Sequence, residues 1–191
     1  MFITVYGVNN IGKTTHTKRL VERLIAEGYD AVRVKFPVYE MNPSGSYLDN
    51  LLRSGGAQAI AEEELQLWFV LNRYQFQPTL KSWLDAGKVV VAEDYVGTGI
   101  AWGTTKGVST EWLEMVNSHL IEPDLALLLD GERKVQATEE NHLHETNGDL
   151  MKRCRDVHLE LAKKHGWIKI SLQPTKEATQ ELIWQQVAGK L

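Results

Sequence analysis

The chain has 191 residues, of which 43% are hydrophobic and 24% charged, values that are ordinary for one globular domain over residues 1–191. Its net charge of −4 argues against broad binding to nucleic acid or to a membrane surface. No apolar stretch is long enough to span a bilayer, and the N-terminus lacks the profile of a signal peptide. The one cysteine, Cys154, cannot form an internal disulfide, which favours a reducing cytoplasm.

The first predicted elements are a buried strand over residues 2–6, a loop, and a helix that ends before Gly28. The loop reads Gly-Val-Asn-Asn-Ile-Gly-Lys-Thr over residues 7–14 and fits the phosphate-binding pattern Gly-x-x-x-x-Gly-Lys-[Ser/Thr] at every fixed position. Its glycines allow a tight turn whose backbone N–H groups point at an anion. In this pattern Lys13 contacts the β- and γ-phosphates and the Thr14 hydroxyl binds Mg²⁺. The sequence therefore predicts binding of a nucleoside triphosphate.

Strands and helices alternate along the rest of the chain. Further strands are predicted over residues 31–36, 88–92, 125–130 and 167–170. Helices are predicted near 48–52, over 60–86, near 110–120, over 150–165 and over 176–187, with a Gly-rich loop after the third strand and a polar segment over about 131–148. Together with the phosphate-binding loop, this alternation predicts the α/β fold of P-loop NTPases. That fold is a three-layer sandwich with a five-stranded parallel sheet and helices on both faces.

Ligands of such sheets bind beyond the carboxyl ends of the strands, so the residues after each strand are the candidates for a site. After the second strand, Phe36-Pro37-Val38-Tyr39 places two aromatic rings, which form either a wall for a flat base or simply a packed loop. After the third strand stand Glu93 and Asp94. A carboxylate there either serves Mg²⁺ or the attacking oxygen, or is a solvated acid at a strand end.

Arg73 is the most informative basic residue in the predicted long helix. Phe69, Val70 and Phe76 lie at i−4, i−3 and i+3, so the arginine points from an apolar face. A buried guanidinium needs an anionic or acceptor partner. That partner is either an internal carboxylate or an acceptor substrate.

The order of these features resembles the thymidylate kinase family, from Phe2 to about Val187. Four stretches carry the resemblance: the loop 7–15 with its helix, Phe36-Pro37 as the family's Phe-Pro motif, residues 67–75 as its Leu-Phe-Ala-x-Asp-Arg-x-Gln helix, and residues 93–102 as its Asp-Arg-Tyr stretch. Glu145 and the run 152–162 resemble the end of its lid and the next helix, and Gln173-Pro174-Thr175 falls where the family has its adenine-binding loop. The resemblance implies a kinase that transfers the γ-phosphoryl group of ATP to a pyrimidine deoxynucleoside monophosphate, above all dTMP, with Mg²⁺ as cofactor.

The resemblance also implies roles for individual residues. Lys13 and Glu93 are catalytic, and Thr14 and Glu93 bind the metal. ATP is bound by Gly7, Asn10, Gly12, Lys13, Thr14, Thr15, Gln173 and Pro174. The acceptor is bound by Asn9, Phe36, Pro37, Tyr39, Arg73, Asp94, Tyr95, Thr98 and Trp102, with Phe36 and Arg73 at the base and Trp102 crowding the sugar 2′ position. Residues 131–148 form the lid that excludes water from ATP.

Two substitutions set the acceptor site apart from the family pattern. Asn9 stands where the family carries an acidic residue, and Asp94 stands where it has the arginine that grips the acceptor monophosphate. We expect Asp94 to be turned away, or to be neutralised by Arg73, Arg53 or a second Mg²⁺, so that a monophosphate still binds.

The lid departs from the family pattern as well, because it has no arginine between Arg133 and Arg153. Lys134, Lys152 and Arg153 are candidates to replace the family's lid arginine.

Two other functions stay open at this point. One is a deoxynucleoside kinase, whose acceptor carries no phosphate and which could use Glu40 as the base for a 5′-hydroxyl. The other is an ATP-binding homologue without catalytic activity.

A homodimer is predicted from the long helix. Leu65 and residues 67–71 leave almost no polar face over nearly two turns, so one sheet cannot cover them all. The family resemblance also implies a dimer through this helix.

Overall fold

The computed structural model describes residues 1–53, 60–131 and 148–191. Its five strands are β1 (Phe2–Tyr6), β2 (Ala31–Lys35), β3 (Val89–Glu93), β4 (Leu125–Asp130) and β5 (Ile168–Ser171). They form one sheet in the order β2-β3-β1-β4-β5, and every neighbouring pair is parallel. The predicted parallel sheet is confirmed, with strand bounds that agree to within one residue.

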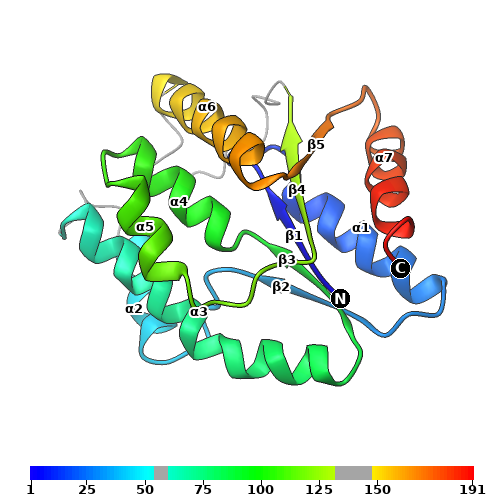
Figure 1. Ribbon diagram of the computed structural model, residues 1–191, viewed down its shortest axis with the longest axis horizontal. Coiled ribbons are helices and arrows are strands. Elements are labelled where there is room, and N and C mark those ends of the chain that lie inside the picture. Colours follow the sequence, from blue (N-terminus) through cyan, green and yellow to red (C-terminus); the bar gives the residue numbers. More distant parts are fainter. Residues whose placement is uncertain (54–59, 132–147) are drawn as a thin grey trace.

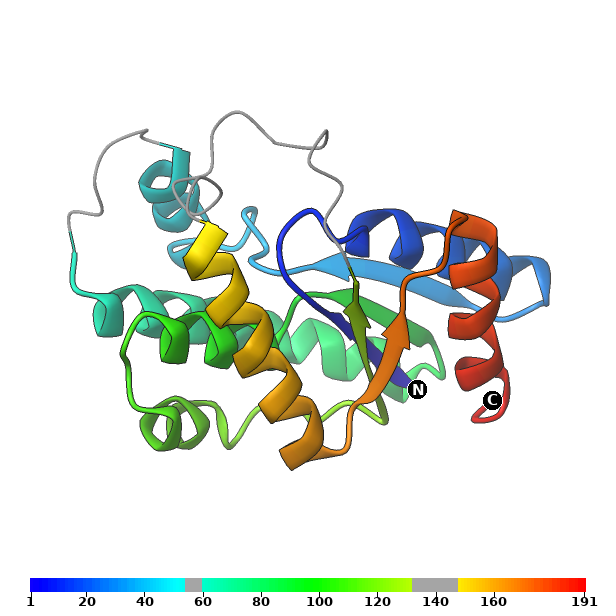
Figure 2. The ribbon, with the colours of Figure 1, turned by 90° about the horizontal axis from the view of Figure 1, so that it is seen from above.

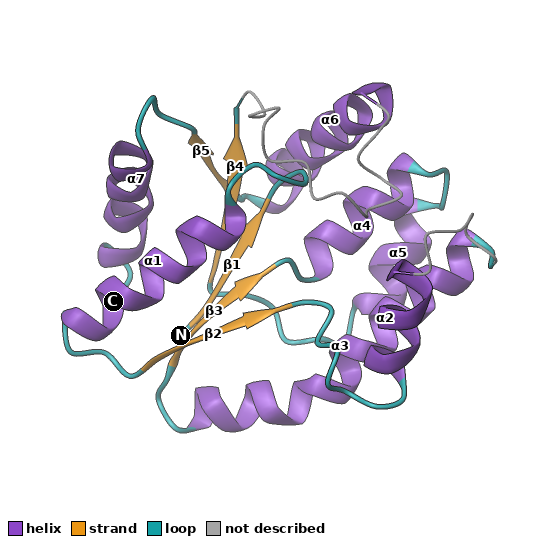
Figure 3. Ribbon diagram, turned by 180° about the vertical axis from the view of Figure 1, so that it is seen from behind, coloured by secondary structure: helices purple, strands orange, loops and turns teal. Residues whose placement is uncertain are grey.

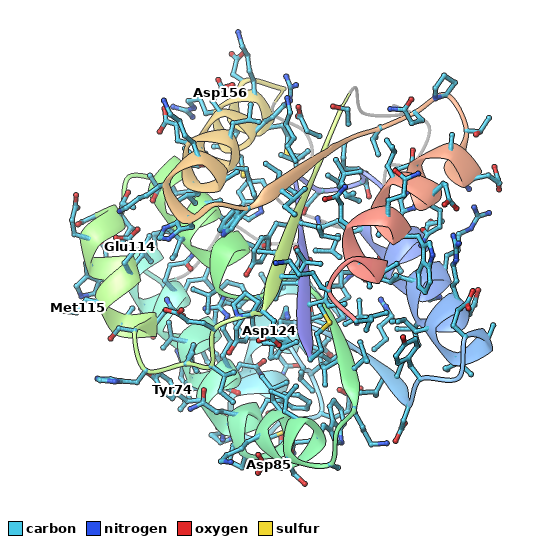
Figure 4. The ribbon with its side chains drawn as sticks, turned by 45° about the vertical axis from the view of Figure 1, so that its right-hand side comes forward. Tyr74, Asp85, Glu114, Met115, Asp124 and Asp156 are labelled. Atoms are coloured by element: carbon cyan, nitrogen blue, oxygen red, sulfur yellow. The ribbon has the colours of Figure 1, made fainter. Side chains whose placement is uncertain are left out.

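Helices cover both faces of this sheet, which gives the predicted three layers. On one face lie α1 (Lys13–Ala26) and α7 (Lys176–Ala188), and on the other α3 (Glu62–Asp85), α4 (Val96–Thr105) and α6 (Gly148–His165) (Figures 1 and 2). The short helices α2 (Ser44–Arg53) and α5 (Thr110–Asn117) pack on α3 and α4. Figure 4 shows Met115 of α5 projecting outward, away from the sheet.

The core lies against the central strands. All five residues of β1 and all five of β3 are buried, because helices cover both of their faces. The strands β2 and β5 lie at the two edges and are more exposed. The central strands therefore give the loops at their carboxyl ends a rigid base.

The predicted Gly-rich loop after the third strand is wrong, because residues 96–105 form α4. Its glycines serve close packing rather than a turn. A Cβ atom at Gly97 would strike Trp167, one at Gly99 would strike the Arg73 guanidinium, and one at Gly103 would strike Leu113. Tertiary packing thus outweighs the low helix propensity of glycine in this element.

Two further parts of the sequence prediction bear on the site. Helix α2 begins at Ser44, earlier than predicted, while the other helix bounds agree more closely. The predicted lid lies, except for its end residues Gly131 and Gly148, outside the described residues. Arg133, Lys134 and Glu145 lie outside them too. Within the described ranges, no helix is both long and apolar enough to cross a membrane.

Candidate active site

The phosphate-binding loop connects β1 to α1 at the carboxyl edge of the sheet (Figure 3). Gly7 and Gly12 have φ angles of 140° and 103°, in a region that disfavours residues with a side chain. The Lys13 side chain is buried and folds back over the loop. Its Nζ donates to Gly7 O at 2.7 Å and to Val8 O at 3.0 Å. Thr14 is exposed in the first turn of α1, which contains no acidic residue, so the helix N-terminus stays favourable for an anion.

Glu93, the last residue of β3, is the best-satisfied charged group of the site. It is only 1% exposed. Its Oε1 accepts a hydrogen bond from Thr14 Oγ1 at 2.6 Å and lies 3.2 Å from Lys35 Nζ. Its Oε2 accepts from Arg33 Nη2 and, at 3.4 Å, from Thr17 Oγ1. The solvated strand-end alternative is therefore wrong.

These partners also set the charge of Glu93. Burial alone would raise the pKa of its carboxyl, but the Thr14 hydroxyl, Lys35 and Arg33 outweigh burial and hold the pKa below its ordinary value. Glu93 is thus ionised at neutral pH. The Thr14 hydroxyl and the Glu93 carboxylate offer adjacent oxygen ligands of the kind that Mg²⁺ prefers, so these two residues fit a Mg²⁺ site.

Asp94 turns toward the phosphate-binding loop. Its backbone is left-handed, with φ of 56°, which aspartate tolerates better than most residues. Its Oδ1 accepts from Thr98 Oγ1 at 2.8 Å and lies 3.5 Å from Lys13 Nζ. The expected neutralisation by Arg73 or Arg53 is wrong, because the salt-bridge partner is Lys13. Burial raises the pKa of the Asp94 carboxyl, and Lys13 only partly offsets that rise.

Arg53 is occupied elsewhere. Its Nε lies 2.5 Å from Asp49 Oδ1, and its guanidinium lies 5.5 Å from the centre of the Tyr39 ring. Arg53 and half-buried Tyr39 thus form a separate cluster with α2.

Hydrogen bonds from α3 hold the loop after β2 in place. Asn72 accepts from Val38 N at 2.8 Å and donates to Val38 O at 2.9 Å. Phe36 is buried, with its ring 5.5 Å from the Phe76 ring and 5.0 Å from the Tyr95 ring. Phe36 is therefore a packed core residue of this loop, whereas Tyr39 is half-buried. The two rings have different surroundings instead of forming one wall.

Arg73 on α3 is a buried cation with few partners. It is 5% exposed, and its Nη1 donates to Asn117 Oδ1 at 3.0 Å. Its Nε is buried and has no hydrogen-bond partner among the residues that the structure describes. Among the described residues no carboxylate lies within 4.0 Å of it, so the internal ion pair is ruled out for this part of the chain. Burial lowers the pKa of the guanidinium to about 10, which leaves it charged at neutral pH.

The remaining acceptor candidates lie on or beside α4. Tyr95 is 1% exposed, packs its ring on Phe2 at 5.2 Å, and has a buried hydroxyl with no hydrogen-bond partner in the described part of the chain. Thr98 and Trp102 lie four residues apart on α4, on one face of the helix. Asn9 is half-buried in the phosphate-binding loop.

The predicted adenine residues lie between β5 and α7. Gln173 donates its backbone N–H to Thr179 Oγ1 at 2.8 Å and its side-chain Nε2 to Ser171 O at 3.0 Å. Pro174 is exposed beside it. Asn10 and Thr15 are half-buried next to Gly12 and Thr14. The structure thus brings the phosphate loop, Glu93, Asp94 and the loop after β2 to one edge of the sheet, with the Gln173 loop at the same edge beyond β5 (Figures 1 and 3).

Three charged residues of this edge do not appear among the sequence candidates. Arg33 and Lys35 lie two residues apart on β2, so their side chains share one face of the strand. This spacing is the sequence signal that could have identified them as a pair. Arg155 binds Asp130 at the end of β4 through Nε at 2.6 Å and Nη2 at 3.1 Å. The lid candidates Lys152 and Arg153 are exposed near the start of α6.

Comparison with known proteins places this site in a family. A family model described as thymidylate kinase matches residues 5–183. The probable thymidylate kinase of Thermococcus kodakarensis is 29% identical, over 89% of this chain and 88% of that protein. The corresponding protein of Methanocaldococcus jannaschii is 28% identical, over 100% of this chain and 95% of that protein.

Solved structures show the same fold. The thymidylate kinase of Candida albicans superposes with a TM-score of 0.84 at 18% identity, over 98% of this chain and 91% of that one. The thymidylate kinase of Ehrlichia chaffeensis gives a TM-score of 0.78 at 22% identity, over 98% of each chain. Because the family model covers nearly the whole sequence, the chain belongs to the thymidylate kinase family, and the prediction of a nucleotide kinase is confirmed.

Proposed function

We propose that this chain transfers the γ-phosphoryl group of ATP to dTMP and releases ADP and dTDP. The observation that carries the acceptor assignment is Arg73, a buried cation with donor groups that no described residue fills. Such a group is costly to bury unless a ligand completes it. Membership of the thymidylate kinase family supports the same reaction.

On the ATP side, the phosphate-binding loop holds the triphosphate. Lys13 exchanges its contacts with Gly7 O and Val8 O for the β- and γ-phosphate oxygens. Thr14 and Glu93 hold a Mg²⁺ ion, which neutralises phosphate charge when it is bound. Asn10, Gly12 and Thr15 complete the loop, and Gln173 and Pro174 lie beside the adenine.

On the acceptor side, Arg73 reads the base. A guanidinium only donates hydrogen bonds, so it favours the keto oxygen of thymine and disfavours the amino group of cytosine. Phe36 and Pro37 support the base from the loop after β2, and Trp102 limits the space beside the sugar. Asn9, Tyr39, Tyr95 and Thr98 line the rest of the acceptor site.

The transfer itself is a single displacement at the γ-phosphorus. An oxygen of the acceptor phosphate forms a bond to that phosphorus while the bond to the bridging oxygen of ADP breaks. The Lys13 ammonium stabilises the negative charge that develops on the phosphate oxygens of the leaving ADP. The protein therefore acts by position and charge, without a covalent intermediate.

Asp94 supports a second candidate, a deoxynucleoside kinase. Its carboxylate adds negative charge beside Lys13, where an acceptor phosphate would be repelled. Glu40, the base considered for that reaction, is exposed in a turn after β2.

An acceptor screen distinguishes these functions. ADP release is measured with ATP and each of dTMP, dUMP, dCMP and thymidine, using Lys13→Met as the inactive control. We expect turnover with dTMP, weaker turnover with dUMP, and little with dCMP or thymidine. Turnover with thymidine alone makes the chain a nucleoside kinase, and turnover with none makes it an ATP-binding homologue.

We also propose a homodimer through α3. Leu67 and Leu71, one helical turn apart, are 46% and 39% exposed, and the neighbouring Trp68 stacks on Tyr47 of α2 with ring centres 4.1 Å apart. Light scattering at micromolar concentration should give the mass of two chains, and Leu71→Glu should halve it. A monomeric wild-type mass would contradict the dimer.

The buried thiol of Cys154 is free, which is compatible with a protein that works in a reducing cytoplasm.

A further inference from the structure

Two acidic side chains, Glu93 and Asp94, end the central strand β3 where an anionic acceptor has to approach. An acceptor phosphate needs a cation at this edge to offset them. The structure describes three cations in contact with this acidic pair: Lys13, Arg33 and Lys35. They differ in how exposed their side chains are.

Lys13 and Arg33 are already committed. Lys13 is 6% exposed and belongs to the phosphate-binding loop. Arg33 is fixed at two points, because its Nη2 binds Glu93 Oε2 while its Nε donates to Thr17 Oγ1 of α1 at 2.9 Å. Arg33 thus ties β2, β3 and α1 together and fixes one oxygen of the Glu93 carboxylate.

Lys35 is the most exposed of the three cations. Its side chain is 49% exposed, and its Nζ lies 3.2 Å from Glu93 Oε1. That oxygen is the one that accepts from Thr14 Oγ1, so it is also the Glu93 oxygen nearest to the proposed Mg²⁺. Glu93 Oε1 would then serve as a ligand of Mg²⁺, and the Lys35 ammonium would need another anionic partner, whereas Arg33 would keep Oε2 in place.

Lys35 is also next to the acceptor side. It is the last residue of β2 and directly precedes the loop of Phe36, Pro37 and Tyr39. Its charge lowers the pKa values of both Tyr39 and Asp94, although burial is the larger influence and raises them. A lysine ammonium can move from one anionic partner to another nearby, because its charge sits on a flexible four-carbon stem.

We propose that Lys35 binds the phosphate of the acceptor nucleotide, and that Mg²⁺–nucleotide binding moves its ammonium there from Glu93 Oε1. Arg33 acts as a positioning residue, which holds Glu93 toward Thr14 throughout. The inference rests on the proposed function, since it requires a monophosphate acceptor. It assigns the cation that compensates for the acidic side chain of Asp94.

Calorimetry tests this assignment on the full chain. The dissociation constants of dTMP and of thymidine are measured for wild type and Lys35→Met, each with and without Mg²⁺ and an ATP analogue whose β–γ bridge is an imido group. We expect Lys35→Met to weaken dTMP binding about tenfold in the presence of Mg²⁺–analogue, the size of one charge-assisted hydrogen bond. Without Mg²⁺–analogue the loss should be smaller. Thymidine and analogue binding should stay within about twofold, and Lys35→Arg should restore dTMP binding.

Two control variants separate charge from position. Lys88→Met removes a partly exposed lysine at the opposite end of β3, whose Nζ lies 2.5 Å from Asp30 Oδ2, and should leave dTMP binding unchanged. Arg33→Met should leave dTMP binding within about threefold but raise the Mg²⁺ concentration needed for tight analogue binding.

The outcomes are distinct. Equal losses for dTMP and thymidine in Lys35→Met, or no loss for either, overturn the role of Lys35 while wild-type dTMP binding keeps the proposed function intact. A loss that does not depend on Mg²⁺–analogue overturns the exchange at Glu93. A wild-type chain that binds thymidine but not dTMP overturns both proposals. Thermal unfolding of each variant establishes that it is folded.

Discussion

Glu93 and Arg73 are two of the buried charges of the site, at 1% and 5% exposure, and they are satisfied in opposite ways. Both oxygens of Glu93 have hydrogen-bonding or charged partners. Within the described ranges, Arg73 donates to Asn117 Oδ1, and its Nε has no acceptor. The saturated carboxylate is fixed before any substrate arrives. The guanidinium instead keeps a donor that no described residue fills, so a ligand can complete its environment.

Replacing Glu93 with Gln should have the largest effect, because Glu93 is the charge whose partners are all in place. The change removes the negative charge that Thr14, Arg33 and Lys35 surround, so we expect kcat to fall by about 10²–10³. The free energy of unfolding should fall by about 1–3 kcal/mol, less than for fully buried pairs because both cations are partly exposed. Coupled ADP release and urea unfolding measure the two effects. A kcat within tenfold of wild type would show that Glu93 is not catalytic.

Replacing Arg73 with Met should give the opposite pattern. The apparent KM for dTMP should rise about 10–100-fold, because the base loses its donor. The free energy of unfolding should stay the same or rise, since an apolar side chain of similar length replaces a buried cation that has no ion-pair partner among the described residues. The same two assays apply. A marked loss of stability with an unchanged KM would make Arg73 a purely structural residue.

His158 on α6 tests whether every unsatisfied buried group marks a ligand site. It is 1% exposed, its Nδ1 lies 2.8 Å from Cys154 O, and its Nε2 has no hydrogen-bond partner among the described residues. Burial lowers the pKa of His158 from 6.5 to about 4, so the unfolded chain binds a proton more readily between these values. The free energy of unfolding should therefore decrease as the pH is lowered, by about 2 kcal/mol from pH 7 to pH 5.

Urea unfolding of wild type and His158→Phe over this pH range measures that effect. The pH-dependent loss should be about 2 kcal/mol smaller in the variant. The KM for dTMP should be the same in both proteins at pH 7. An equal pH dependence in both proteins would refute the assignment to His158.

Asn117→Asp should have the smallest effect of these substitutions. It would give Arg73 a charged partner within the protein, as Glu93 already has. A carboxylate at this position gives the guanidinium an internal ion-pair partner and draws its donors away from the acceptor. We expect the KM for dTMP to rise about tenfold with little change in KM for ATP. Asn117→Gln serves as the neutral control. An unchanged KM in Asn117→Asp would mean that saturation of Arg73 does not govern acceptor binding.

The sequence is informative where the signal is contiguous. Apolar runs predict all five strands, and the phosphate-binding loop predicts Lys13 and Thr14, because in each case neighbours in sequence act together. The glycines of α4 mislead, since their role is to make room for Trp167, Arg73 and Leu113 from distant elements. Propensity alone cannot distinguish glycines that end a helix from glycines that allow it to pack closely.

Parts of the site that depend on tertiary contacts are less accessible from sequence. The burial of Arg73 follows from helical periodicity, but Asn117 meets it only because α5 packs beside α3. The departure at Asp94 is readable, whereas its turn toward Lys13 depends on a left-handed backbone angle. No local pattern specifies either contact.

The strand order has a consequence for how acceptor preference is encoded. β2 and β3 lie on one side of β1, while β4 and β5 lie on the other. Helix α1 packs on β2 and β3, and α7 is tied to it by Arg19–Glu177 at 2.9 Å and Arg23–Glu181 at 2.7 Å. Apart from Asn9, every residue proposed to bind the acceptor falls within residues 31–120, one uninterrupted stretch of chain. We expect that stretch to carry acceptor preference with it when it is transplanted into a relative, which steady-state kinetics of the chimera would measure.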